Sequence, residues 1–305
     1  MNSFKGLLLL VLLGGVSRSF AQDDLFRVKV GLGLATYFGD LKEKAKPINQ
    51  SSAAFSIGVS YDITDQIIGK LDFGLLKLRG DDRFNNRIDF INRNLSFQTN
   101  IWEINLGVEY DFLNMKNEDY ILSPYISLGL GIFHFNPWAY NRAGEKVYLN
   151  PLGTEGQGLP SYPDRKPYKL LQLQIPIGAG IKFALNENIN AFFDVSLRKI
   201  FTDYIDDVGN TYPDKNAILS ESPNGAATIA LTYRGDELTN LPYPSTSLNR
   251  GGYTKDIYYT LGVGISVRLN NFSIGSGGGG GGGGSKRIGR IGSRSSRLRN
   301  PRSVF

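Results

Sequence analysis

The sequence has no cysteine, which excludes disulfides, thiolate metal sites, a cysteine nucleophile and a lipid-modified cysteine. It has one histidine, His134, so catalysis that depends on a second imidazole is also excluded. After its first residues it lacks any apolar run near the roughly 20 residues that a spanning helix needs. If this chain spans a membrane, it must do so with β-strands.

The one long apolar run lies at the N-terminus. Lys5 precedes the apolar residues 7–16, and Ser19-Phe20-Ala21 follows with small residues at the two positions that a signal peptidase reads. This layout predicts a signal peptide over residues 1–21, cleaved before Gln22. A membrane anchor is the weaker interpretation, because ten apolar residues are too few to span.

The formal charge of +6 comes from the two ends of the chain. Without the two basic residues of the leader and the seven of the C-terminal tail, the body over residues 22–270 is mildly acidic, at −3. The tail, residues 271–305, contains eight consecutive glycines at 277–284, which predict a disordered coil. Its basic residues are candidates for contact with an anionic partner such as peptidoglycan or an acidic protein face: Lys286, Arg287, Arg290, Arg294, Arg297, Arg299 and Arg302. A disordered appendage is the alternative.

Eight segments alternate apolar and polar residues with the period of a strand. They cover approximately residues 26–38, 53–62, 67–79, 102–110, 121–135, 171–183, 189–200 and 257–269. Several reach the 9–11 residues that a tilted strand needs to cross a bilayer. We therefore expect an all-β protein.

The polar face of these strands carries both signs of charge. Six cations (Arg27, Lys29, Lys70, Lys182, Arg198, Arg268) oppose four anions (Asp72, Glu103, Glu109, Asp194). A membrane barrel turns such a face toward its lumen. In a narrow barrel these charges would pair across the lumen, because an unpaired buried charge is costly. Paired inward-facing glycines, such as Gly31/Gly33 and Gly262/Gly264, would let the narrow barrel curve.

The connections alternate between short and long along the whole chain. Short ones lie near residues 64–65, 114–118 and 186–188, and long ones at 39–52, 80–94, 136–167 and 201–255. Outer-membrane barrels show this alternation, with short periplasmic turns and long extracellular loops. The prediction is an antiparallel transmembrane β-barrel of eight strands over residues 22–270, with the tail in the periplasm. The apolar stretch at residues 228–234 could add a strand, and a barrel of ten strands stays open as the alternative.

Candidate chemistry is sparse. Asp203, Asp206 and Asp207 are close enough in sequence to bind Ca²⁺, but they match no EF-hand, so a hydrogen-bonded acidic loop is favoured. His134 would lie near the outer rim, where a lipid-modifying enzyme could use it, yet the sequence offers it no partner. We expect no enzyme, no cofactor and no metal.

Several stretches together resemble the PorG-like outer-membrane barrel family of the Bacteroidota. They are residues 37–41 (Tyr-Phe-Gly-Asp-Leu), 135–137 (Phe-Asn-Pro), 149–158 (Leu-Asn-Pro-Leu-Gly-Thr-Glu-Gly-Gln-Gly), 174–178 (Gln-Ile-Pro-Ile-Gly) with Lys182, and 202–208 (Thr-Asp-Tyr-Ile-Asp-Asp-Val). The resemblance implies a non-enzymatic part of the type IX secretion machinery, which in many members supports gliding motility. It also implies contact with a periplasmic ring made of a lipoprotein and its partner. The glycine and arginine tail departs from the family pattern.

The sequence thus predicts an integral barrel in the bacterial outer membrane. Its expected surroundings are outer-membrane lipid and lipopolysaccharide, with the type IX ring as its protein partner by resemblance. Export excludes nucleic acid as a partner. Two alternatives stay open, namely an outer-leaflet lipid-modifying enzyme and a passive channel.

Overall fold

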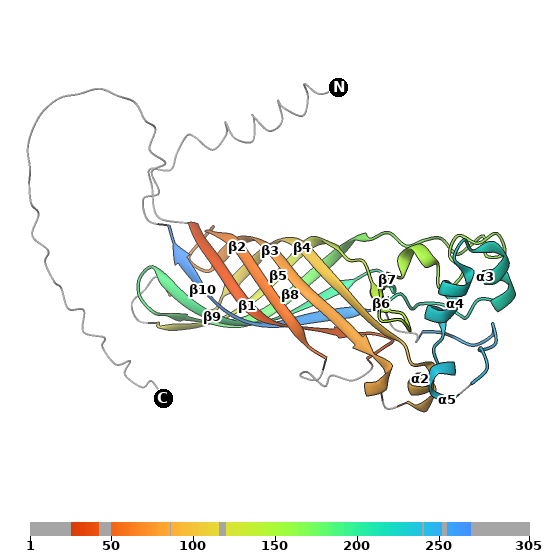
Figure 1. Ribbon diagram of the computed structural model, residues 1–305. Coiled ribbons are helices and arrows are strands. Elements are labelled where there is room, and N and C mark those ends of the chain that lie inside the picture. The colour runs from red at the N-terminus through yellow and green to blue at the C-terminus, as the bar shows by residue number, and fades with distance from the viewer. Residues whose placement is uncertain are drawn as a thin grey trace, which may run out of the picture.

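A computed structural model describes residues 26–42, 50–85, 87–115, 120–239, 241–251 and 255–269 of the chain. Its eight long strands pair antiparallel with their neighbours in chain order, and the first pairs with the last, so the sheet closes into a barrel (Figure 1). This confirms the predicted all-β, antiparallel, eight-stranded barrel. The strands are β1 (Phe26–Phe38), β2 (Ser52–Asp62), β3 (Ile67–Asp81), β4 (Ser96–Asp111), β5 (Leu122–His134), β8 (Leu171–Ala184), β9 (Ile189–Ile200) and β10 (Ile257–Arg268).

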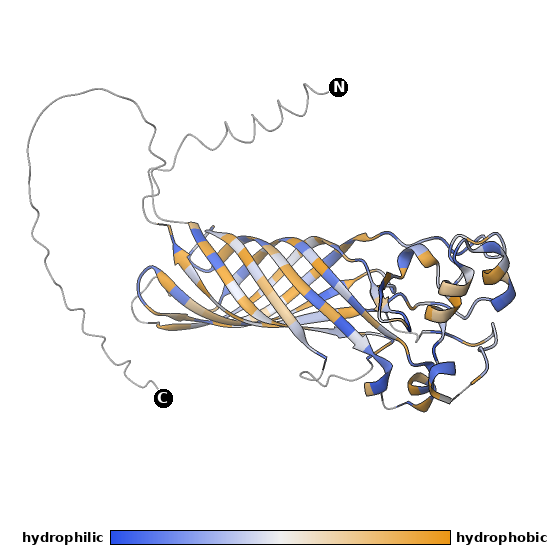
Figure 2. Ribbon diagram, in the orientation of Figure 1, coloured by the Kyte–Doolittle hydropathy of each residue, from blue (hydrophilic) through white to orange (hydrophobic). Residues whose placement is uncertain are grey.

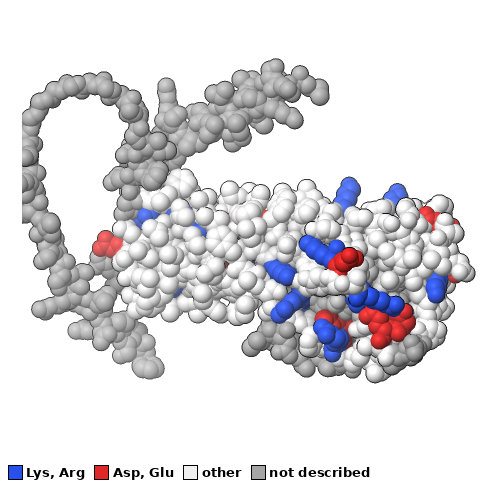
Figure 3. Space-filling view, viewed as in Figure 1, with Lys and Arg blue, Asp and Glu red and all other residues white. Residues whose placement is uncertain are grey.

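The two faces of the barrel wall differ as the alternation predicts. Outward side chains are large, apolar and exposed, with Leu106 at 67% and Leu130 at 70% of full exposure. Figure 2 shows apolar stripes along the wall, and Figure 3 shows an almost uncharged surface over the same region. Because a contiguous apolar surface of this size is unfavourable in water, it fits a lipid environment.

Glycines allow the wall to close tightly where the first and last strands meet. Gly31 pairs with Gly264 and Gly33 with Gly262 across the β1–β10 seam. The ring of Phe192 lies over this seam, and a Cβ on Gly264 would come within 2.4 Å of it. The inward glycines therefore make room for an aromatic ring inside a narrow barrel.

The two ends of the barrel differ in the length of their connections. The short connections, from Asp62 to Ile67, from Asp111 to Leu122 and from Ala184 to Ile189, start and finish at the end where β1 begins and β10 ends. At the opposite end the long connections fold into a cap (Figure 1). The cap contains η1 (Asp82–Phe84), α2 (Ile88–Arg93), β6 (Trp138–Tyr140), β7 (Lys146–Tyr148), η2 (Asn150–Leu152), α3 (Lys215–Glu221), α4 (Gly225–Thr232) and α5 (Asp236–Thr239).

Three details differ from the sequence-based expectation. The suggested extra strand at residues 228–234 is wrong: this stretch belongs largely to α4, where three alanines favour a helix and Thr228 Oγ1 donates to the carbonyl of Leu152 at 3.2 Å. The long connection after β5 holds the β6–β7 hairpin, which pairs with β4. β4 begins at Ser96, earlier than predicted, because its first residues pair with the end of β3.

Among the residues described, no helix is both long and apolar enough to cross a membrane.

Candidate functional site

The lumen is crossed by charged side chains that come from different strands. Near the short turns, Glu109 of β4 forms ion pairs with Lys29 of β1 at 3.3 Å, with Lys182 of β8, and with Lys70 of β3 at 3.9 Å. Lys182 also reaches Asp111 at 2.8 Å. These charges therefore pair across the barrel, as predicted for a narrow lumen, whereas the ion pairs of the described residues include neither Asp194 nor Arg268.

A second network lies nearer the cap. The buried carboxylate of Glu103 accepts hydrogen bonds from Arg198 at 2.7 Å, Tyr258 at 2.7 Å and Gln174 at 2.9 Å. Gln174 also donates to Asn105 at 2.7 Å. These groups come from β4, β8, β9 and β10, so they link opposite sides of the wall.

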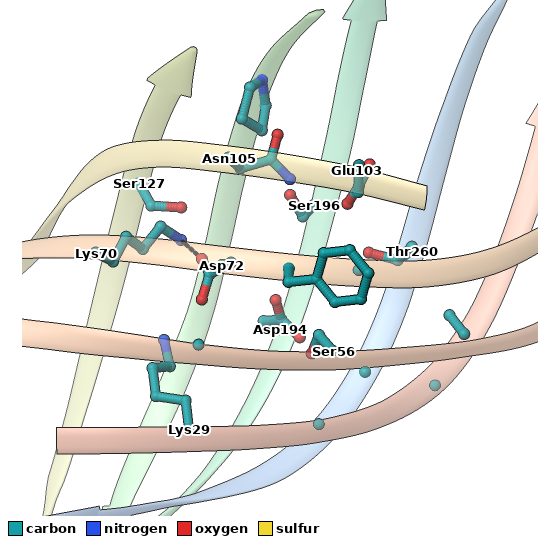
Figure 4. A pocket seen from close by; sticks show the side chains of 18 of the residues that line it. Lys29, Ser56, Lys70, Asp72, Glu103, Asn105, Ser127, Asp194, Ser196 and Thr260 are labelled. Atoms are coloured by element: carbon teal, nitrogen blue, oxygen red, sulfur yellow. Dashed lines mark ion pairs between the residues drawn. The ribbon is translucent and has the colours of Figure 1, made fainter. Parts of the chain in front are cut away.

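A small cavity with charged and apolar lining residues lies between the two networks. It has a volume of about 80 Å³, enough for several water molecules. Figure 4 shows side chains from different strands pointing into it, among them Lys29, Lys70, Asp72 and Asp194. A second cavity, of about 30 Å³, lies on the short-turn side beside Glu109 and Asp111. Both cavities suit water or a small ion rather than a large solute.

Aromatic rings fill the outer end of the lumen. Tyr37 packs edge-on against Phe97 at 4.9 Å, and Phe133 packs against Phe135 at 5.6 Å and Tyr258 at 6.0 Å between ring centroids. All five residues are buried. This apolar core closes the barrel beneath the cap.

Two buried arginines hold the cap together. Arg93 of α2 pairs with Asp82 at 2.7 Å and donates to the carbonyls of Asp40, at 3.0 Å, and Arg250. The bonds to Asp40 and Arg250 join the end of α2 to two other loops, and the pair with Asp82 closes its own loop. Asp82 Oδ2 also accepts from the amide of Leu95 at 2.9 Å, which fixes the loop beyond α2.

Arg250 is 1% exposed and joins the remaining loops. It donates to the carbonyls of Asp207 at 2.6 Å and Thr232 at 3.0 Å, and forms an ion pair with Glu155 at 3.3 Å. Its Nη1 also donates to Thr154 Oγ1 at 3.1 Å. Sequence reasoning missed both arginines, because nothing local distinguishes them from exposed loop arginines.

The motif Gly153-Thr-Glu-Gly-Gln157 is part of this network. Thr154 and Glu155 are fully buried. Thr154 Oγ1 donates to a carboxylate oxygen of Asp207, and Glu155 accepts from the amide of Gly209 at 3.0 Å. Gly153 and Gly156 have φ of +61° and +80°, values that favour glycine. The motif therefore builds the cap and contacts the acidic motif at residues 202–208.

The three aspartates of that acidic motif point to different partners. Asp206 accepts a hydrogen bond from the hydroxyl of Tyr37, and Asp207 accepts one from Tyr168 at 2.7 Å. Asp203 is half-buried and accepts no hydrogen bond from Tyr37 or Tyr168. In the described part of the chain, no three acidic or histidine side chains are arranged to hold a metal ion. The structure thus shows a hydrogen-bonded acidic loop at this position.

Burial raises the pKa of these carboxyl groups. It raises the pKa of Asp203 to about 6 and that of Asp207 to about 6, although Arg250 lowers the latter in part. Burial and neighbouring carboxylates raise the pKa of Asp206 and of Asp256 well above the usual range. The cap therefore contains several carboxyl groups that hold a proton more strongly than in an unfolded chain.

His134 lies at the cap end of β5 on the outward face. Its ring stacks on Trp102 of β4, with centroids 5.6 Å apart and planes 6° apart. The partner that the structure gives it is thus an aromatic ring of the neighbouring strand. The leader at residues 1–21 and the basic tail residues Lys286 to Arg302 lie outside the described residues.

Comparisons with known proteins agree with this architecture. A family model described as an outer membrane protein beta-barrel domain matches residues 7–220. No curated protein matches the sequence.

Solved structures with a similar fold are outer-membrane barrels of low sequence identity. Neisserial surface protein A is 10% identical, with 80% of this chain and 97% of that chain covered and a TM-score of 0.42. OprG from Pseudomonas aeruginosa is 12% identical, with 80% and 96% covered and a TM-score of 0.37. The outer membrane enzyme PagL is 13% identical, with 80% and 99% covered and a TM-score of 0.31. Likenesses this distant carry no argument about function.

Proposed function

Because this chain belongs to the outer membrane protein beta-barrel domain family, we propose that it is a non-enzymatic barrel of the type IX secretion and gliding machinery. In this role it holds the periplasmic ring of that machinery at the outer membrane. The barrel supplies the membrane anchor, and the surfaces outside the membrane supply the contacts.

The observation that carries the proposal is the closed lumen. Two polar networks and an aromatic layer occupy it, and the cap lies over its outer end. A barrel filled in this way has no wide aqueous path for a solute, unlike the large water-filled barrels. The surfaces available for contact with other proteins are therefore at the two ends of the barrel.

The motifs of the PorG-like resemblance support the type IX assignment. Residues 149–158 and 202–208 are far apart in sequence, yet Thr154 and Asp207 meet in one buried network with Arg250. A family that shares both motifs would share this contact, and hence the cap.

The position of the chain ends supports a periplasmic contact. Arg27 pairs with Arg268, so β1 begins and β10 ends together at the short-turn end, which is the periplasmic end in barrels of this type. The chain that follows β10 is therefore expected on the periplasmic side, where this proposal puts the ring proteins. Its seven basic residues would suit an acidic face of the ring or peptidoglycan.

Affinity purification from detergent-solubilised outer membranes tests the proposal. We expect the full-length protein to co-purify with type IX ring proteins, as identified by mass spectrometry. Two matched variants locate the contact: a chain ending at residue 270, and a full-length chain with the seven basic tail residues changed to glutamine. If neither variant co-purifies with ring proteins, the contact depends on the charge of the tail. If both variants still co-purify with them, the contact is made by the periplasmic turns. Absence of ring proteins from the wild-type sample would overturn the proposal.

A further inference from the structure

A basic and aromatic patch lies where the apolar wall meets the cap. Along β3 the outward positions run Leu71, Phe73, Leu75 and then Lys77, so the first outward charge follows directly after the apolar belt. Figure 3 shows that charged atoms are scarce over the wall and gather at this boundary and on the cap. Lys77 is therefore placed at the level of the outer-leaflet headgroups.

The β6–β7 hairpin brings a second lysine to the same place. Trp138 of β6 pairs with Gln98 of β4, beside β3, and with Tyr148 of β7. The ammonium of Lys77 lies 5.4 Å from the centroid of the Trp138 ring, and that of Lys146 lies 4.6 Å from it. Lys146 Nζ also donates to the hydroxyl of Tyr148 at 3.0 Å. Both ammonium groups thus contact the same indole ring.

The positive charge of this pair is not compensated within the described residues. No described carboxylate forms an ion pair with Lys77 or Lys146, and the nearby Glu145 accepts a hydrogen bond from Asn141 at 2.8 Å. By contrast, Arg142 in the same hairpin pairs with Asp236 at 2.5 Å and Glu237 at 3.1 Å. Two lysines on one ring, neither of them in an ion pair with a described carboxylate, attract an anion.

We propose that Lys77, Trp138 and Lys146 form a binding site for the phosphate of an outer-leaflet lipid headgroup. The phosphate bridges the two ammonium groups while Trp138 holds them in position. Its acyl chains lie along the apolar wall directly below, where Leu75 is 47% exposed. A phosphate-bearing lipid matches both the charge of the patch and the apolar surface beside it, whereas a soluble anion matches the charge alone.

Native mass spectrometry of the full-length protein in detergent tests the site. The probes are diphosphorylated lipid A and the same lipid A with its phosphates removed, titrated separately. We expect the wild type to bind the phosphorylated lipid about tenfold more tightly, because each basic residue facing an anionic lipid contributes a several-fold factor. In the Lys77→Gln/Lys146→Gln variant we expect this preference to fall to about twofold or less, with binding of the dephosphorylated lipid unchanged.

Lys199→Gln is the matched control. Lys199 is an outward lysine near the cap end of β9, four strands around the barrel from β3. This variant should keep the tenfold preference for phosphorylated lipid A. If Lys199→Gln and the Lys77→Gln/Lys146→Gln variant lost this preference equally, the binding would reflect general charge attraction and the proposal would be overturned. It would also be overturned if the wild type showed no preference, or if a large excess of inorganic phosphate displaced both lipids equally well. Heat-dependent gel migration reports whether each variant is folded. If the double variant does not fold, the single variants Lys77→Gln and Lys146→Gln provide the test. Each should reduce the preference for phosphorylated lipid A about threefold.

Discussion

Arg250, one of the two buried arginines of the cap, provides the most direct test of the structure. Changing Arg250 to Met keeps a similar side-chain volume and removes the charge that faces Glu155 and Asp207. It also leaves the carbonyls of Asp207 and Thr232 without their donor. Removing one partner of a buried ion pair costs about 3–5 kcal/mol, since the remaining charge is left uncompensated. The opening equilibrium of the cap should therefore rise by about two to four orders of magnitude.

Hydrogen exchange with mass spectrometry on the full-length protein in detergent measures this effect segment by segment. We expect faster exchange in residues 150–160 and 205–233 and unchanged exchange in the barrel strands. The matched control is Arg142→Met, which breaks a half-exposed pair with Asp236 and Glu237. Exposed pairs contribute about 0–1 kcal/mol, so this variant should be close to wild type. If the two variants differed little, the view of Arg250 as the link between the cap loops would be refuted.

The remaining predictions concern pH, the lumen, the seam and the rim. Burial raises the folded-state pKa of Asp203 and Asp207 to about 6, so their contribution to stability is present in acid and lost as pH rises through about 6. The protection factors of the cap amides, which correct for the intrinsic pH dependence of exchange, should be higher at pH 5 than at pH 7, and the reverse order would contradict the assignment. Glu109→Gln leaves Lys29 without its carboxylate partner, whereas Lys182 keeps Asp111. The change should lower the free energy of unfolding of the barrel by about 3 kcal/mol in urea titrations, while planar-bilayer recordings of wild type and variant show no wide channel. Gly264→Val places side-chain atoms against the backbone of Val30 and the ring of Phe192 and should reduce the fraction of heat-modifiable, folded barrel. The control Gly69→Ala in β3 should leave that fraction nearly unchanged, because the nearest atom to the added Cβ, beyond its chain neighbours, is Ile63 Cδ1 at 3.4 Å, an ordinary van der Waals contact. His134→Ala removes a ring stacked on Trp102 and should leave the lipid A profile of the cell unchanged by mass spectrometry; a changed profile would favour the enzyme alternative over the scaffold.

Alternation of residue types was enough to predict the barrel, because strand geometry is local. In a strand, side chains point to opposite faces with a period of two, so the apolar wall and the polar lumen could be assigned residue by residue. The alternation of short and long connections then distinguished a membrane barrel from a soluble sandwich. The eight strands lie within a few residues of their predicted positions, except for the early start of β4 at Ser96.

The same pattern predicted that lumen charges would pair, but it could not say which pairs would form. Glu109 pairs with Lys29, which is 80 residues away in sequence. Which cation lies opposite Glu109 depends on the tilt and stagger of the strands in the closed barrel. Asp62 and Asp111, at the ends of their strands, were not expected to take part, yet they pair with Arg27 and Lys182.

The cap was decided by tertiary structure alone. Arg250 contacts residues as far away as Thr154, 96 positions earlier, and no spacing rule connects loop residues over such a distance. The same holds for α4, which was mistaken for a strand because a short apolar run has no distinctive period. The sequence by itself determined a closed eight-stranded wall with an apolar outside and a charged inside, since those features repeat every two residues. Only the folded chain determined the buried arginine network and the paired lysines on Trp138, since both arise where loops from different strand pairs meet.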